Sequence, residues 1–213
     1  MKKHILLIMM LFLLTGCMKI NDAKIPDIIK EVQTSKLVLA NQSRNGYKYY
    51  LPTHLNLKET IKTNEIFLSG NYAYYMYIDL VSYHEKVPFT YELSPSSYLS
   101  MDISDDRSVG YLEVNVKQNK YLIEIMYNYA KIEVIVDQNY LKEAITNALI
   151  ILSTIKYNDD IINNLMGNDV LSLGEETLNI FDTNRGESNF LQDIKDSDVY
   201  EGADGLPDRD KIN

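Results

Sequence analysis

The stretch GYLEVNVKQNKYLIEIMYNYAKIEVIVD, residues 110–137, decides the fold of this chain. At its start, Leu112, Val114 and Val116 lie on one face of an extended backbone, and the residues between them are polar. This alternation has the two-residue period of a β-strand with one buried and one solvated side. We therefore predict a strand whose polar face, which carries Glu113, points to water.

Two further alternating segments follow, at residues 121–127 and 131–137. The connections, at 118–119 and 128–130, are only two or three residues long. Turns of this length join neighbouring antiparallel strands. Residues 109–137 therefore predict a three-stranded antiparallel meander.

The pattern changes to a helical period directly after the meander. Over residues 141–155 the apolar side chains recur at intervals of three and four, the spacing of one helix face, and Asn139 is a candidate N-cap. This helix is expected to lie across the sheet. A shorter helix is predicted to begin at residue 159 or 160 and to end at Met166, with Gly167 as its stop.

Upstream of the meander the sequence predicts one helix and several extended segments. Residues 25–33, with a proline at the first helical position, predict the helix. Residues 47–51 and 65–68 favour strands, and residues 57–63 favour one or two helical turns. The long stretch 72–83 is apolar on both faces for much of its length, which is typical of a central strand in a sheet covered on both sides.

A sheet followed by a covering helix predicts an α+β fold, an antiparallel β-sheet covered by helices. The run GYKYYLP at 46–52, the later meander and a closing helix that ends in ILSTIKYN at 151–158 resemble the layout of the Mog1/PsbP-like family. The resemblance spans about residues 35–158 and rests on the order of the elements. It implies a sheet sandwiched by helices and a binding or assembly role more than catalysis, and no functional residue is carried over.

The N-terminus has the order of a secretory signal. A short basic start at residues 2–4 precedes the unbroken apolar run from Ile5 to Leu14. A membrane-spanning helix needs about 20 apolar residues, so this run is too short to cross a bilayer. It is interpreted as a targeting segment that is removed.

The cut region Leu14-Thr15-Gly16-Cys17 resembles the lipobox of bacterial lipoproteins. The resemblance implies that Cys17, the only cysteine in the sequence, receives a diacylglyceryl group and becomes the new N-terminus. Two acyl chains give lasting attachment where one holds only reversibly, so the lipid bilayer is an expected partner and the extracytoplasmic face of the cell membrane the expected location. The alternative is a plain signal peptide with a cysteine nearby by chance, or an uncleaved anchor.

These observations divide the chain into four parts. We expect a lipoprotein signal peptide at 1–16, a tether at 17–25, a single α+β domain at 26–181 and an acidic tail at 182–213. The tail carries nine acids against four bases and few apolar groups. A segment that cannot bury apolar area stays mobile, so the tail is predicted to be flexible.

The charge of the chain excludes one class of partner. Removal of residues 1–16 takes away Lys2 and Lys3 and no acid, so the net charge changes from −9 to −11. An acidic body repels phosphate backbones, so nucleic acid is not an expected partner. With Cys17 consumed by lipid, no thiol remains for a disulfide, and stability is expected to come from packing.

Three short patterns could carry chemistry, and each has a simpler explanation. Ser153 and Lys156 match S-x-x-K, the spacing of nucleophile and lysine in penicillin-recognising enzymes, but the partner motifs are absent and both residues fit a polar helix edge. His54 and His84 lie in no metal-binding frame, and His84 beside an acid is more typical of a surface pair. The tail segment 204–210 resembles half of a calcium loop without its first two aspartates. We therefore assign no catalytic residue, metal or cofactor.

Tyrosine is the dominant aromatic residue, with 17 copies against five phenylalanines and no tryptophan. Four of them crowd one predicted strand: Tyr72, Tyr74, Tyr75 and Tyr77. If one face of that strand stayed open, the rings could stack on sugars or grip a partner strand. The alternative, that they pack under helices, is favoured.

The sequence thus favours a lipid-anchored, non-enzymatic surface protein that binds or supports another envelope component, a protein or a glycan. Two alternatives stay open: an envelope hydrolase with an unrecognised site, and a solute-capture protein for a transporter. The second is disfavoured because such receptors are usually larger and two-lobed.

Overall fold

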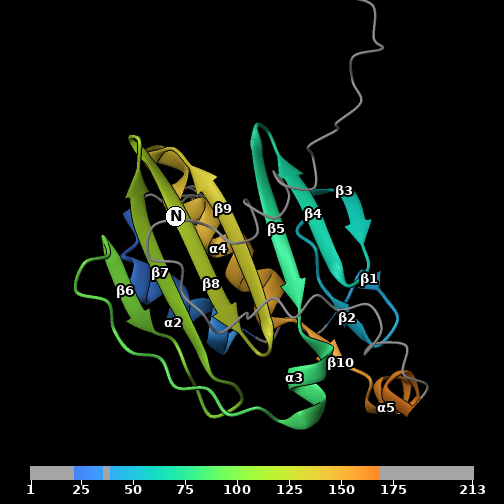
Figure 1. Ribbon diagram of the computed structural model, residues 1–213. Coiled ribbons are helices and arrows are strands. Elements are labelled where there is room, and N and C mark those ends of the chain that lie inside the picture. The colour runs from blue at the N-terminus through green and yellow to red at the C-terminus, as the bar shows by residue number, and fades with distance from the viewer. Residues whose placement is uncertain (1–21, 36–38, 168–213) are drawn as a thin grey trace, which may run out of the picture.

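The computed structural model describes residues 22–35 and 39–167. A seven-stranded antiparallel sheet with the strand order β3-β4-β5-β9-β8-β7-β6 forms its centre (Figure 1). Its strands are β3 (Asn56–Ile61), β4 (Asn64–Ser69), β5 (Tyr72–Ile78), β6 (Leu99–Asp102), β7 (Gly110–Lys117), β8 (Lys120–Tyr127) and β9 (Ala130–Val136). A second, three-stranded sheet has the order β1-β2-β10 and consists of β1 (Gln42–Ser43), β2 (Tyr47–Tyr49) and β10 (Lys156–Tyr157).

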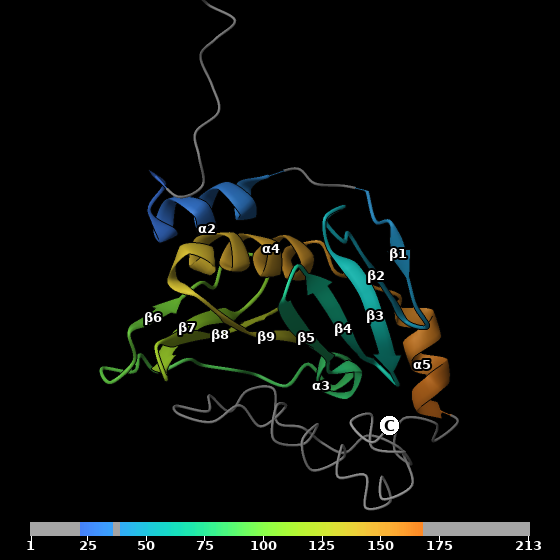
Figure 2. The ribbon, with the colours of Figure 1, turned by 90° about the horizontal axis from the view of Figure 1, so that it is seen from above.

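Helices lie on both sides of the large sheet. They are α2 (Ile25–Thr34), α3 (Leu80–Glu85), the 3-10 helix η3 (Gln138–Tyr140), α4 (Leu141–Ser153) and α5 (Asp159–Gly167). Helix α4 packs across β8 and β9, and α2 packs on α4. Figure 2 shows α2 and α4 on one side of the sheet and α3 on the other. An antiparallel sheet with covering helices confirms the predicted α+β class.

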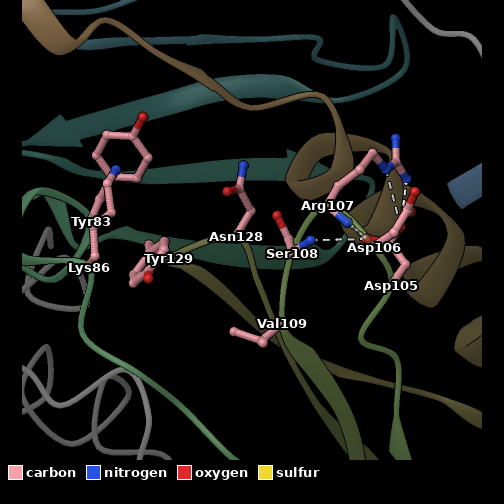
Figure 3. A pocket seen from close by; sticks show the side chains of 9 residues that line it. All are labelled: Tyr83, Lys86, Asp105, Asp106, Arg107, Ser108, Val109, Asn128 and Tyr129. Atoms are coloured by element: carbon pink, nitrogen blue, oxygen red, sulfur yellow. Dashed lines mark hydrogen bonds and ion pairs between the residues drawn. The ribbon is translucent and has the colours of Figure 1, made fainter.

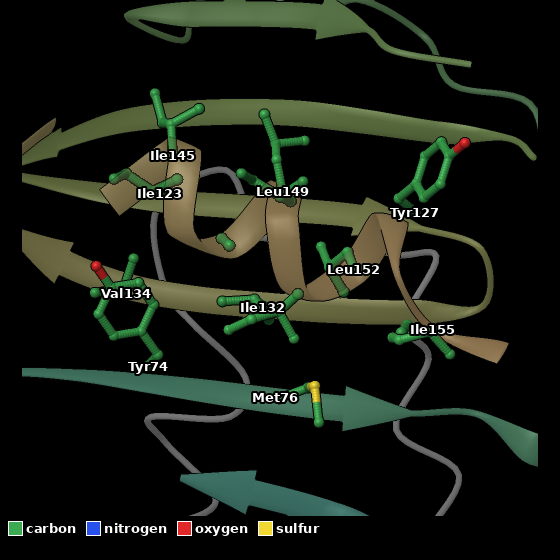
Figure 4. Packing of buried hydrophobic residues seen from close by; sticks show 14 of the residues in the cluster. Tyr74, Met76, Ile123, Tyr127, Ile132, Val134, Ile145, Leu149, Leu152 and Ile155 are labelled. Atoms are coloured by element: carbon green, nitrogen blue, oxygen red, sulfur yellow. The ribbon is translucent and has the colours of Figure 1, made fainter. Parts of the chain in front are cut away.

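The main core lies between α4 and the sheet. Ile145, Leu149 and Leu152 of α4 meet Ile123 and Ile132 of β8 and β9, and all five side chains are buried (Figure 4). Burial of one such side chain contributes about 1.5–3 kcal/mol. This layer is therefore a main source of the stability of the domain.

The meander β7-β8-β9 is present as predicted. Its two connections are two-residue turns with positive φ, 48° and 64° at Gln118 and Asn119, and 55° and 57° at Asn128 and Tyr129. Positive φ at both central residues is typical of type I′ turns, whose twist matches that of the paired strands. The meander is therefore closed at both ends by tight hairpin turns.

The polar face of the meander is not solvated where the prediction placed it. Glu113 is 1% exposed, whereas the apolar Val116 is 57% exposed. The segment between α3 and β6, residues 87–98, packs on this face, and its Tyr91 and Ser97 donate hydrogen bonds to Glu113. We call residues 87–98 the strap. The prediction of a solvated face is wrong at Glu113, although Lys117 at the end of the same face is exposed, because alternation along one strand does not reveal a cover supplied by another segment.

The helical turns predicted for residues 57–63 are also wrong. Asn56–Ile61 is the edge strand β3, paired with β4, and its six residues are all exposed. An exposed strand has no buried face, so its sequence shows no recognisable two-residue period.

The strand predicted over 72–83 ends early, because β5 stops at Ile78 and α3 follows. The Asp79 carboxylate accepts a hydrogen bond from the Ser82 backbone N–H at 2.7 Å, which caps the first turn of α3. The apolar run therefore belongs to two elements of different period.

The helices predicted at 25–33, 141–155 and 159–166 are confirmed as α2, α4 and α5. Asn139 is not the cap of α4, because the 3-10 helix η3 leads into it and no side chain caps its first turn. Strands β1, β6 and β10 are missing from the prediction, since they are two to four residues long and too short to show a period.

Several predictions concern parts of the chain outside the described residues. The signal peptide at 1–16, most of the tether and the tail at 182–213 lie there, and the resemblance to the Mog1/PsbP-like layout stays a prediction. Within residues 22–35 and 39–167, no helix is both long enough and apolar enough to span a bilayer.

Candidate functional site

A pocket of about 430 Å³ opens where α3, the loop before β7 and the β8–β9 turn meet. Its lining residues are Tyr83, Lys86, Asp105, Asp106, Arg107, Ser108, Val109, Asn128 and Tyr129. Figure 3 shows Tyr83, Lys86 and Tyr129 on one side, Arg107 and Asp106 on the other, and Asn128 and Ser108 between them. We call this hollow the α3 pocket.

The aromatic wall of the pocket is built by the end of α3. Lys86 ends the helix with a left-handed backbone, φ 52°, and its Nζ lies 3.5 Å from the centroid of the Tyr83 ring. The other face of that ring stacks on Tyr157, with the centroids 3.9 Å apart. Burial, together with a hydrogen bond from Tyr83 to Asp159, raises the pKa of Tyr83 to about 12. The hydroxyl therefore stays protonated at neutral pH, and the ring is a fixed platform under the Lys86 ammonium group.

The β8–β9 turn forms the floor in a costly conformation. A bulky residue such as Tyr129 seldom adopts positive φ, and the strain is of the order of 1–3 kcal/mol. Several hydrogen bonds hold the turn. Among them, Tyr129 donates its hydroxyl to the Val87 carbonyl, the Asp79 N–H donates to the Tyr129 carbonyl, and the Tyr157 hydroxyl donates to the Asn128 carbonyl. The surrounding chain therefore fixes this shape.

The opposite wall is a loop closed on Asp105. The Arg107 side chain donates to Asp105 Oδ2 at 3.2 and 2.8 Å, and the Tyr127 hydroxyl and the Ser108 N–H donate to Oδ1 at 2.9 and 3.0 Å. Burial opposes ionisation of Asp105, but these hydrogen bonds outweigh it and hold the pKa of Asp105 below its ordinary value. Asp105 is therefore a structural carboxylate of the loop.

The polar groups that the pocket offers to a ligand include those of Lys86, Asp106 and Asn128. Lys86 and Asp106 are exposed, and no hydrogen bond of the Asn128 side-chain oxygen is seen within the described part of the chain. An ammonium, a carboxylate and an amide beside tyrosine rings suit a polar ligand that forms hydrogen bonds. The pocket therefore offers a partner both hydrogen-bonding groups and aromatic surface.

The four tyrosines considered either as a binding surface or as packing under helices do not share one face of β5. Tyr74 and Tyr77 are buried, with Tyr74 next to Tyr140 and Asn147. Tyr72 and Tyr75 are half-buried, and Tyr72 stacks on Tyr140 with the ring centroids 4.4 Å apart. Only Tyr72 and Tyr75 therefore present part of a ring to the surface, and a binding role for them stays a prediction.

The Ser153–Lys156 pattern is not brought together on one helix. Ser153 is the last residue of α4 and donates its hydroxyl to the Ile150 carbonyl at 3.3 Å, whereas Lys156 is exposed in β10. His84 Nδ1 lies 2.8 Å from Glu85 Oε1 at the surface, which is the simpler of the two explanations for it.

The remaining sequence-predicted features are a lone histidine, the anchor and the tail. His54 lies 3.0 Å from the Asn147 side-chain oxygen. Cys17 and the calcium-like segment 204–210 lie outside the described residues. Within the described ranges, no group of three or more His, Cys, Asp or Glu side chains could hold a metal ion.

The pocket residues themselves escape the sequence analysis. In the sequence, the pocket is marked only by the polar run at 105–108 and the Asn-Tyr pair at 128–129. Both are typical of ordinary loops, and only the fold brings them to α3.

No protein-family model matches this chain, and no curated protein matches it.

Proposed function

We propose that this chain is a membrane-anchored extracytoplasmic lipoprotein that acts without catalysis, by binding another envelope component or supporting its assembly. The observation that carries the proposal is the lipobox-like sequence at 14–17, placed shortly before a folded domain that has a pocket lined by charged, amide and aromatic side chains. The α3 pocket is the proposed site of contact with the partner, a glycan or a polar protein segment.

The short tether supports a partner within the envelope. Residues 18–24 separate Cys17 from the start of α2 at Ile25. An extended chain covers at most about 3.3–3.6 Å per residue, so Cys17 and α2 are at most about 30 Å apart. A domain held this close meets partners of the same membrane, or of the adjacent layer, at a raised effective concentration.

Hydrogen bonds join one wall of the pocket to α2, the helix that follows the tether. The Gln33 side chain donates to the Ile103 carbonyl at 2.6 Å, and Arg107 donates to the Gln33 carbonyl at 2.8 Å. Both bonds join α2 to the loop that forms one wall of the pocket. A lipid anchor would therefore hold the pocket in a restricted position above the membrane, which suits a supporting role.

The alternative of an envelope hydrolase gains nothing from the S-x-x-K pattern. Ser153 and Lys156 are separated by the end of α4, so the lysine cannot act as a base one helical turn from the serine.

The anchor is tested by mass spectrometry of the N-terminal peptide of the native protein. We expect Cys17 at the N-terminus with its acyl groups, and we expect Cys17→Ala to release the protein from membranes or to stall it as a precursor. An unmodified Cys17, or a mature chain that begins elsewhere, contradicts the proposal.

The pocket is tested with Lys86→Gly, which removes the ammonium group but keeps the left-handed backbone that glycine favours at a helix end. Lys62→Gly is a matched control, because Lys62 has φ 56° in the β3–β4 turn, away from the pocket. In a strain that lacks the gene, we expect Lys62→Gly to reverse the defect caused by the deletion and Lys86→Gly not to reverse it. Circular dichroism should show that both variants are folded.

The hydrolase alternative is tested in the same strain with Ser153→Ala and His84→Ala. If both variants function fully, neither Ser153 nor His84 is a catalytic residue of a hydrolase. Loss of function in either variant, together with full function of Lys86→Gly, would favour the hydrolase and contradict the binding proposal.

A further inference from the structure

Three glutamates form a row across the middle of the meander, on the face opposite α4. Glu113 of β7, Glu124 of β8 and Glu133 of β9 occupy directly opposite positions in the two strand pairs. Their exposed fractions are 1%, 3% and 0%. Side chains at such positions have Cβ atoms about 5 Å apart. The three carboxyl groups therefore share one buried strip, which we call the glutamate row.

One buried ammonium group contacts this row within the described part of the chain. Lys131 Nζ lies 3.2 Å from Glu133 Oε1 and 3.7 Å from Glu124 Oε2, and Lys131 is 3% exposed. Full ionisation of the row would leave three negative charges against one positive charge in a strip that water does not reach. Like charges at this spacing disfavour ionisation of one member. The row is therefore more stable with one proton bound.

Glu124 is the member best placed to take that proton. It has a carboxyl neighbour on each side, Glu113 from β7 and Glu133 from β9, and it also faces Tyr111 of β7 and Lys131 of β9. Tyr111 donates its hydroxyl to Glu124 Oε1 at 2.6 Å. Burial, reinforced by the two glutamates, outweighs Lys131 and Tyr111 and raises the pKa of Glu124 to about 7.

The strap is fastened to this row. The Tyr91 ring stacks on the Tyr111 ring with the centroids 4.7 Å apart, and the Tyr91 hydroxyl donates to Glu113 Oε2 at 2.7 Å. Ser97 donates its hydroxyl to Glu113 Oε1 at 2.7 Å. Opening of the strap would admit water to the row and favour the ionised form of Glu124. By linkage, a proton bound at Glu124 then favours the closed strap.

We propose that the glutamate row and the strap form a pH-sensitive latch, in which a proton bound at Glu124 holds the strap closed and loss of that proton loosens it. When the strap is open, Glu124 is hydrated and is expected to have the ordinary pKa of glutamate. The ratio of closed to open strap is therefore expected to fall about tenfold between pH 6 and pH 8.

Hydrogen exchange read by mass spectrometry tests the latch on the full-length protein. Protection factors of peptides from the strap, corrected for the intrinsic effect of pH on exchange, are compared at pH 6 and pH 8. We expect about a tenfold loss of protection in the unmodified protein and no comparable loss in Glu124→Gln. Glu59→Gln, at an exposed position of β3, is the matched control and should behave as the unmodified protein does.

Two results would overturn the latch. One is a strap with equal protection at both pH values in the unmodified protein, and the other is an unchanged loss of protection in Glu124→Gln. A carbon-13 NMR titration of the glutamate carboxyl groups covers the case in which Glu124→Gln does not fold. It needs no variant, and a protein in which no glutamate titrates above pH 6 contradicts the latch as well.

Discussion

Glu65 joins the two sheets through three partners. It lies on β4 with 0% exposure, accepts hydrogen bonds from the Tyr47 and Tyr49 hydroxyls at 2.9 and 2.7 Å, and pairs with Arg44. Burial and the neighbouring Glu65 raise the pKa of both tyrosines well above the ordinary value. Both hydroxyls therefore stay available as donors to this carboxylate.

Glu65→Ala is expected to lower the free energy of unfolding by about 3 kcal/mol, since it leaves Arg44 and two buried hydroxyls without their carboxylate. Urea unfolding followed by circular dichroism measures the loss. Glu59→Ala, at an exposed position of β3, is the control and should stay within about 0.5 kcal/mol of the unmodified protein. A loss below about 1 kcal/mol for Glu65→Ala would mean that the two sheets do not depend on this carboxylate.

Glu124 makes stability depend on pH in an unusual direction. Its pKa is about 7 in the folded chain and has the ordinary value of 4.5 when the chain is unfolded. Between these values the folded state binds one proton more at this site, so the contribution is fully present below pH 4.5 and is lost as the pH rises through 7. We expect the free energy of unfolding of the unmodified protein, relative to Glu124→Gln, to fall from pH 5 to pH 8. Urea titrations across that range check the sign, and a rising difference would contradict it.

At the scale of elements, α3 shows how a helix of six residues is held. Such a helix is too short to be stable alone and depends on its ends. Asp79 binds the Ser82 N–H and hydroxyl, both at 2.7 Å, and Lys86 ends the helix with a left-handed backbone. Tyr83 lies in the helix and Lys86 is its C-cap, so the caps also set the position of one pocket wall.

Asp79→Ala is expected to cost about 1 kcal/mol and to loosen α3. Hydrogen exchange of residues 80–85 and urea unfolding measure the local and the global effect. Asp27→Ala is the matched control, because Asp27 lies in the first turn of α2, where no side chain caps the helix, and should cost only a few tenths of a kcal/mol. Equal effects of the two substitutions would show that the Asp79 cap contributes little.

At the scale of the whole molecule, the domain is expected to fold without the acidic end of the chain. The composition after residue 190 predicts a segment that buries little apolar area. Removal of residues 191–213 should leave the melting temperature unchanged, and limited proteolysis should trim the C-terminus first. A large drop in melting temperature on truncation would show that these residues dock on the domain.

Sequence patterns predicted those parts of the fold whose signal is local. The two-residue period at 110–137 and the helical period at 141–155 each lie within one or two neighbouring elements. They predicted the meander, the covering helix and the α+β class, all of which the structure confirms. The edge strand β3 and helix α3 were missed, because the first has no buried face and the second continues the apolar run of β5.

The sequence by itself determined the class of fold and, through the lipobox-like motif at Cys17, the expected location. Only the tertiary structure decided which polar groups are buried and where a pocket forms. The strap covers Glu113 across a sheet face, and α3, the loop at 105–109 and the β8–β9 turn meet at the α3 pocket. These contacts join segments that are far apart along the chain, and they form only when the whole domain packs. A two-residue or helical period describes one segment at a time, so it does not predict them.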